Sequence, residues 1–252
     1  MIVIDHLVKR YGDHTAVNDV SLAADAGEIF GFLGPNGAGK TSTIKMMMGL
    51  MKPTSGTITI DGHDIQKDPI AAKTALGYIP DRPILYEKLT AWEYMRFIAG
   101  LYIIDDAVLQ DRGNRYLEVF GLSEWKGELV ENFSHGMKQR LNISAAFMRN
   151  PKVLVLDEPL IGLDPRGARL LKEMLQASRD KGMCIFMSTH ILEIAEQMCD
   201  RMAIINKGTI IASGTAGEIR EKSHSSGSTL EQVFLRLTGG EDVLKVVKEL
   251  KE

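Results

Sequence analysis

The sequence predicts an α/β fold in which a parallel sheet is flanked by helices. Continuous apolar runs at Glu28–Leu33, Val153–Leu156 and Cys184–Ser188 are typical of strands that are buried on both faces. A helical pattern between the last two runs predicts a parallel βαβ unit. From about Thr90 to Arg149, aromatic and aliphatic residues recur at helical spacing, which predicts a mostly helical subdomain inserted into this core.

The amino-terminal segment has a different pattern. Ile2, Ile4 and Leu7 fall on one side of an alternating stretch, and Ala16–Leu22 repeats the pattern, which predicts an antiparallel β layer. The carboxy-terminal segment contains the sequence SHSSGS, a predicted flexible connector, before a helical tail that starts at Leu230. We therefore divide the chain into a core with its β layer (1–88 and 150–216), a helical subdomain (89–149), and a linker with a tail (217–252).

The helix predicted between the second and third buried runs has clear ends. Asp164 suits the N-cap, Pro165 suits the first helical position, and Lys181-Gly182 suits the end. Its apolar stripe consists of Leu170, Leu171, Met174 and Leu175.

The composition narrows the class of protein to which this chain can belong. The 252 residues carry a net charge of −3, so we expect no nucleic-acid partner, which would favour a positive excess. The two cysteines form no metal-binding or disulfide pattern. No apolar run approaches the roughly 18–20 residues that span a bilayer. If the protein serves a membrane process, we expect a separate chain to cross the membrane.

The segment Gly34-Pro-Asn-Gly-Ala-Gly-Lys-Thr41 matches the P-loop pattern G-x-x-x-x-G-K-[ST] between a buried strand and a helix. Glycines let successive backbone N–H groups point at a phosphate, Lys40 supplies a positive charge, and the Thr41 hydroxyl suits Mg²⁺. The motif leaves kinases, GTPases, helicases and transporter ATPases open. The predicted nucleotide-binding residues are Gly34, Pro35, Asn36, Gly37, Ala38, Gly39, Lys40, Thr41 and Ser42.

Two carboxylates end the apolar strand that starts at Val153. Asp157 at the strand tip suits a Mg²⁺ ligand, and Glu158 after it suits a general base for water. A carboxylate base beside a metal carboxylate favours water as the nucleophile. The doublet therefore predicts hydrolysis.

The order of further motifs resembles the ABC ATPase family over residues 2–216. Tyr11 precedes the P-loop, and Ser134-His-Gly-Met-Lys-Gln-Arg140 stands where the family carries its signature, usually L-S-G-G-Q. Glu158-Pro159 is followed by Gly162-Leu-Asp164, similar to the family's D-loop, and Ser188-Thr-His190 resembles its switch histidine. The resemblance implies a P-loop NTPase core of the RecA-like type.

The resemblance also implies roles for these residues. Tyr11 stacks on adenine, Asp164 joins the nucleotide site, and His190 contacts the γ-phosphate and orients water beside Glu158 and Lys40. Ser134 and Gly136, just before a helix, clamp the γ-phosphate held by a second copy of the chain, so that two copies enclose two ATP molecules.

This sequence departs from the family pattern at two places. In the signature, His135 replaces the first glycine and Met137 the glutamine, and a histidine adopts positive φ less readily than glycine. After Gly77-Tyr-Ile-Pro, Asp81 stands where the family usually has glutamine. Two interpretations of Asp81 stay open: a third Mg²⁺ ligand with Thr41 and Asp157, or a surface residue near the membrane partner.

We therefore expect an ATP- and Mg²⁺-dependent ATPase that powers an ABC transporter through a separate transmembrane subunit, at the cytoplasmic face of the membrane. The tail Leu230–Gly239 resembles that of drug- and polysaccharide-exporting (ABC-2) members, which favours export. The alternatives are an importer ATPase, a soluble ABC protein that acts on nucleic acid or ribosomes, and a nucleotide-binding regulator without turnover.

Overall fold

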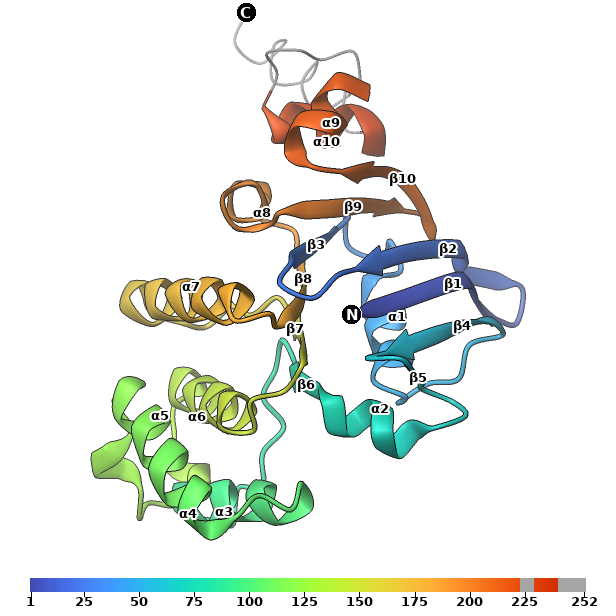
Figure 1. Ribbon diagram of the computed structural model, residues 1–252. Helices are drawn as coiled ribbons and strands as arrows, with labels where there is room; N and C mark the ends of the chain where they lie inside the picture. Colours follow the sequence, from blue (N-terminus) through green and yellow to red (C-terminus); the bar gives the residue numbers. More distant parts are fainter. Residues whose placement is uncertain (223–228, 240–252) are drawn as a thin grey trace, which may run out of the picture.

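The computed structural model describes residues 1–222 and 229–239, so the connector predicted at 223–228 lies outside the described residues. Two sheets form the centre of the molecule (Figure 1). The smaller is antiparallel in its pairings, in the order β2-β1-β4-β5, and confirms the predicted β layer. Its strands are β1 (Ile2–Tyr11), β2 (His14–Ala24), β4 (Ser55–Ile60) and β5 (His63–Asp64).

The larger sheet has the strand order β10-β9-β3-β8-β7-β6. Its neighbours are parallel except for the edge strand β10, which pairs antiparallel with β9. The predicted βαβ unit is confirmed, because β7 and β8 are parallel neighbours. The strands are β3 (Ile29–Leu33), β6 (Leu76–Ile79), β7 (Val153–Asp157), β8 (Cys184–Thr189), β9 (Arg201–Asn206) and β10 (Thr209–Gly214).

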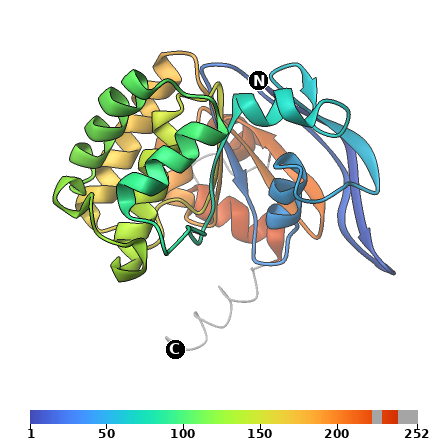
Figure 2. The ribbon, with the colours of Figure 1, turned by 90° about the horizontal axis from the view of Figure 1, so that it is seen from below.

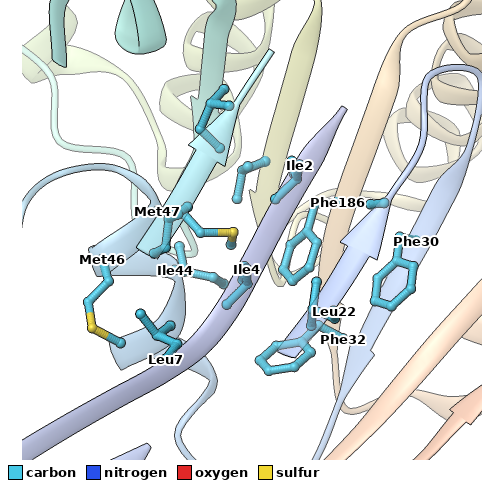
Figure 3. Packing of buried hydrophobic residues seen from close by; sticks show 14 of the residues in the cluster. Ile2, Ile4, Leu7, Leu22, Phe30, Phe32, Ile44, Met46, Met47 and Phe186 are labelled. Atoms are coloured by element: carbon cyan, nitrogen blue, oxygen red, sulfur yellow. The ribbon is translucent and has the colours of Figure 1, made fainter. Parts of the chain in front are cut away.

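The central strands read as unbroken apolar runs because both faces of the large sheet are covered. Phe30, Phe32 and Phe186 point to one side, into a core shared with the antiparallel sheet and helix α1 (Lys40–Met47) (Figure 3). The alternate residues Ile29 and Ile185 point to the other side, into a core shared with α6 (His135–Met148) and α7 (Pro165–Asp180). The period-2 alternation is present, but water reaches neither face.

The segment of the chain between β6 and β7 is mostly helical. Figures 1 and 2 show its helices on the side of the molecule away from the antiparallel sheet. They bury a cluster of their own, which includes Tyr94, Met95 and Leu141. The elements are α3 (Ala91–Leu101), α4 (Asp106–Val108), a π-helical turn (Leu109–Gly113), α5 (Asn114–Val119), two 3₁₀ turns (Ser123–Trp125 and Val130–Asn132) and α6.

Helix α7 has the predicted ends. The Asp164 carboxylate accepts a hydrogen bond from the Gly167 N–H at 2.9 Å, and Gly182 after the helix has φ +92°. Helix α1 ends at Met47, and Gly49 shortly after it has φ +62°. The tail forms α10 (Leu230–Thr238), which packs on α8 (Leu192–Met198) and α9 (Ala216–Lys222); α2 spans Pro69–Ala75. In the part of the chain that the structure describes, no helix is both long and apolar enough to cross a membrane.

Candidate functional site

The loop between β3 and α1 is built around glycines that the fold requires. A Cβ on Gly34 would lie 2.4 Å from the carbonyl oxygen of Ile205 in β9. Gly39 has φ +113°, and a Cβ there would lie 2.5 Å from the carbonyl oxygen of Ala16 in β2. Both contacts are with backbone, which cannot swing aside as a side chain can. The loop is therefore held closely between two strands of different sheets, with its N–H groups ahead of α1.

Lys40 is the first residue of α1 and is buried. Its ammonium donates to the carbonyl oxygens of Gly34 at 2.6 Å and Pro35 at 3.2 Å. Burial lowers the pKa of Lys40, and the nearby carboxylates of Glu158 and Asp157 oppose this effect. The Lys40 ammonium and the carboxylates of Asp157 and Glu158, at the end of β7, thus share one electrostatic environment.

A pocket of about 370 Å³ opens beside this loop. Tyr11 contributes to its wall, with 46% of the residue exposed. The Tyr11 hydroxyl donates to the Met51 sulfur at 2.8 Å, and the Lys9 ammonium lies 5.2 Å from the ring centroid. The pocket thus combines an aromatic face with a loop of backbone donors, which suits an aromatic base joined to phosphates. It is lined by Tyr11, His14, Ala16, Asn36, Gly37, Gly39, Lys40, Thr41 and Ser42.

Among the residues predicted for the loop, Gly34, Pro35 and Ala38 do not line this pocket, although Gly34 and Pro35 hold Lys40. Sequence analysis missed His14 and Ala16 of β2. The pairing of Tyr11 with His14 across the β1–β2 turn brings them there. The alternating pattern of β2 predicts a strand, but it does not indicate that this strand approaches the P-loop.

Asp157 ends β7 almost fully buried, with 5% exposure. One of its oxygens accepts a hydrogen bond from the hydroxyl of Ser188, its neighbour across the parallel strands β7 and β8. Burial raises the pKa of Asp157, and repulsion from Asp81 and Glu158 adds to that rise, whereas Ser188 and Lys40 lower it. Asp81 itself is exposed and accepts a hydrogen bond from the Arg82 N–H at 2.8 Å. A positive charge beside Asp157 would favour its ionised form.

Glu158 has an unusual backbone conformation, with φ +48°. Its N–H donates to the Ser188 carbonyl oxygen at 3.1 Å, which anchors the strained residue to β8. Nδ1 of His190 lies 2.8 Å from Oε1 of Glu158. The two side chains predicted to handle water are thus joined as a carboxylate–imidazole pair, a geometry that can hold and orient a proton.

The predicted signature residues form a second group. Ser134 is exposed and caps α6, its hydroxyl accepting from the Met137 N–H at 3.3 Å. Gly136 approaches Gly162: a Cβ on Gly136 would lie 3.1 Å from the Gly162 carbonyl oxygen. Asp164 is exposed and caps α7. Ser134, Gly136 and Asp164 do not line the pocket beside the P-loop.

The positive φ that histidine adopts less readily than glycine is not needed at His135. His135 is the first residue of α6, and its φ is not positive. The histidine is therefore accommodated without a positive φ.

Comparison with known proteins places the chain in a family. The family described as ABC transporter matches residues 17–161. The chain is 38% identical over 233 residues to the linearmycin resistance ATP-binding protein LnrL of Bacillus subtilis, covering 92% of this chain and 74% of that protein. It is 34% identical over 238 residues to the ABC-type transporter ATP-binding protein EcsA of the same organism, covering 94% and 96%.

A solved structure described as the ATP-binding subunit of an ABC transporter superposes with a TM-score of 0.91 at 35% identity, covering 94% of this chain and 99% of that one. This likeness confirms the predicted P-loop NTPase core with its β layer and helical insertion. The chain belongs to the ABC transporter ATP-binding proteins, which bind ATP and hydrolyse it to power transport.

Proposed function

We propose that ATP binds with its adenine on the Tyr11 ring and its phosphates in the loop Gly34–Ser42. The observation that carries this proposal is that Tyr11 lines the same pocket as the loop residues Asn36, Gly37, Gly39, Lys40, Thr41 and Ser42. The loop N–H groups, the start of α1 and the Lys40 ammonium supply positive charge for the phosphates. Lys40 would exchange its bonds with the Gly34 and Pro35 carbonyls for phosphate oxygens.

For the chemical step, we assign Glu158 as the general base and His190 as the residue that orients water and contacts the γ-phosphate. Water attacks the γ-phosphorus, its proton passes to the Glu158 carboxylate, and the bond to the ADP oxygen breaks. The 2.8 Å contact between His190 and Glu158 supports this pairing, as does the anchoring of Glu158 on β8. Lys40 contributes positive charge for the transferring phosphoryl group.

The residues fit a Mg²⁺ ion held by Thr41 and Asp157. Both offer the oxygen donors that Mg²⁺ prefers, and a cation would favour the ionised form of the buried Asp157. Within residues 1–222 and 229–239, no three His, Cys, Asp or Glu side chains converge on a metal position. A Mg²⁺ ion bound together with a nucleotide needs no such cluster, because phosphate oxygens and water molecules complete its coordination shell. When bound, it neutralises charge on the phosphates.

Asp81 keeps two proposed roles. Its repulsion of Asp157 supports a place near the metal, and its exposure supports a contact with the membrane partner. Asp81→Gln distinguishes them. A metal role predicts a changed Mg²⁺ dependence of hydrolysis, and a partner role predicts unchanged hydrolysis with weakened transport coupling. If neither changes, both roles are wrong.

We also propose that Ser134, Gly136 and Asp164 complete the ATP site of a second copy. Ser134 and Asp164 are exposed, Gly136 is half-buried, and none of the three lines the pocket of its own chain, which supports a role toward another molecule. The start of α6, a helix of 14 residues, adds a positive dipole end beside the Ser134 hydroxyl.

The proposed transporter uses separate transmembrane subunits, which hold this chain at the inner, cytoplasmic face of the membrane. Exposed apolar side chains between β6 and α4, at Ile84, Tyr86, Leu101 and Ile103, support docking of a protein partner there. The linearmycin resistance for which LnrL is named favours export of a compound. Increased susceptibility of cells that lack this chain to a panel of antibiotics would support export.

The central experiment is Glu158→Gln, with the exposed Glu173→Gln on α7 as a matched control. We expect Glu158→Gln to lower ATP turnover by about 100-fold or more, to retain ATP binding, and to accumulate an ATP-dependent dimer in light scattering. Near-normal turnover would show that Glu158 is not the base. Purification of the tagged chain from membranes tests the partner, since recovery only with ribosomes or nucleic acid would exclude transport.

A further inference from the structure

His135 makes a contact that neither its exposed position nor its place in the sequence predicts. The imidazole lies where a side chain on Gly162 would be, and Gly162 precedes α7 by three positions. A Cβ placed on Gly162 would lie 2.6 Å from Cδ2 and 2.7 Å from Nε2 of His135. Real Cβ atoms do not approach other atoms so closely, so the ring fills the space that any side chain at 162 would need.

Gly162 also lies close to the second residue of α6, the helix that begins at His135. The Gly162 carbonyl oxygen is the nearest neighbour of a Cβ that would be added to Gly136, at 3.1 Å. Gly162 also has φ +81°, which favours glycine on conformational grounds. The first two residues of α6 therefore lie close to one glycine of the loop after β7, within a single chain.

That loop leads directly to Glu158. The Ile161 N–H donates to the Glu158 carbonyl oxygen at 3.1 Å, and the Leu163 N–H donates to Leu160 at 3.4 Å. Asp164 then fixes the other end of the loop by capping α7. Only the short turn from Glu158 to Ile161 separates Gly162 from the carboxylate that contacts His190.

We propose that His135 is a positioning residue for hydrolysis. Its ring links the start of α6 to the loop that carries Glu158. The position of the Glu158 carboxylate relative to Ser134 is thereby fixed. The inference rests on the proposed roles of Glu158 and Ser134, and it adds a residue at which this chain departs from the glycine that its family usually carries. Because the ring occupies the space beside Gly162, removing or crowding the ring should displace this loop and leave the P-loop pocket unchanged, since that pocket contains neither residue.

The decisive test places Gly162→Ala in two backgrounds, wild type and His135→Gly. With the ring present, the new methyl group must displace the ring or the loop, and we expect kcat for ATP to fall about tenfold or more with KM within about twofold. With His135→Gly, the space is open, and the same change should lower kcat by less than about threefold. An equal loss in both backgrounds would overturn the proposal.

Two controls separate this contact from backbone strain and from failure of the proposed function. Gly182→Ala also introduces a side chain at positive φ, +92°, but into open space, so it should lower Tm without depending on residue 135. Glu158→Gln tests the base independently: if turnover survives that change, the assigned mechanism fails whatever the 135–162 pair does.

A second comparison keeps the proposal testable if Gly162→Ala does not fold. His135→Gly should lower kcat, and His135→Gln, whose planar amide has a similar reach, should restore most of it, with KM for ATP unchanged in both. Equal turnover of wild type, His135→Gly and His135→Gln would show that the ring positions nothing.

Discussion

The P-loop group and the signature group are held in place by different means. The loop from Gly34 to Lys40 is gripped by the backbone of β2 and β9, and its pocket is formed within one chain. Ser134 and Asp164 are exposed helix caps, held by single hydrogen bonds. The first group is therefore preformed by the core. The second offers donors outward, which is what a site completed by a second copy requires.

This comparison makes opposite predictions for the two groups. Changes in the P-loop group should weaken ATP binding by the isolated chain or the stability of the fold. Changes in the signature group should leave ATP binding by the isolated chain nearly intact and reduce turnover. The expected effects decrease from Lys40 to Tyr11.

Lys40→Ala should have the largest effect. It removes the buried ammonium that the loop encloses and the positive charge proposed for the phosphates. We expect turnover to fall by roughly 100-fold or more and ATP affinity of the isolated chain to fall with it. Fluorescent-nucleotide titration and a phosphate-release assay measure the two quantities, with the half-buried Lys172→Ala on α7 as the control. Unchanged ATP affinity would place the phosphates elsewhere.

Gly39→Ala compared with Gly37→Ala tests how the loop is held. Both glycines have positive φ, but only at Gly39 would a methyl group meet backbone, at 2.5 Å, whereas Gly37 has open space. We expect Gly37→Ala to lower the free energy of unfolding by about 1 kcal/mol and Gly39→Ala by more than about 2 kcal/mol. Denaturant unfolding measures the difference. Equal losses would mean that β2 does not confine the loop.

Ser134→Ala should separate the two groups most directly. We expect about tenfold lower turnover with unchanged ATP affinity of the isolated chain, because Ser134 lies outside the pocket. Ser134→Ala also removes the N-cap of α6, which lowers the free energy of unfolding by about 1 kcal/mol, and this loss contributes to any fall in turnover. Thr90→Ala, which removes the cap of α3, is the matched control and should lower Tm but not turnover. A similar fall in turnover for both variants would leave Ser134 only a structural role.

The sequence was most informative where local chemistry determines structure. The buried strands, the cap at Asp164 and the P-loop glycines each depend on neighbours a few residues away or on a fixed spacing, so their patterns are readable. The division of the chain at 89 and 149, and the roles assigned to the site residues, stay predictions.

Contacts between distant segments were not readable. Ser188 bonds to Asp157 because two parallel strands share a register, and His135 lies on Gly162 because a helix meets a loop. Neither pairing can be recognised from the periodicity or the composition of the sequence. At His135, knowledge of the usual glycine suggested a backbone problem, whereas the structure shows a side-chain contact.

The smallest expected effect concerns the link between Tyr11 and Met51. The hydroxyl-to-sulfur contact ties the aromatic wall of the pocket to the segment after α1. Tyr11→Phe keeps the ring and removes this tie, so we expect KM for ATP to rise about two- to threefold with kcat unchanged. Met51→Leu should do the same, and the double variant should be no worse than either single one, because all three remove one contact. Additive losses would show that the two residues act separately, and a fall in kcat would show that the base-binding wall also affects the chemistry at Glu158.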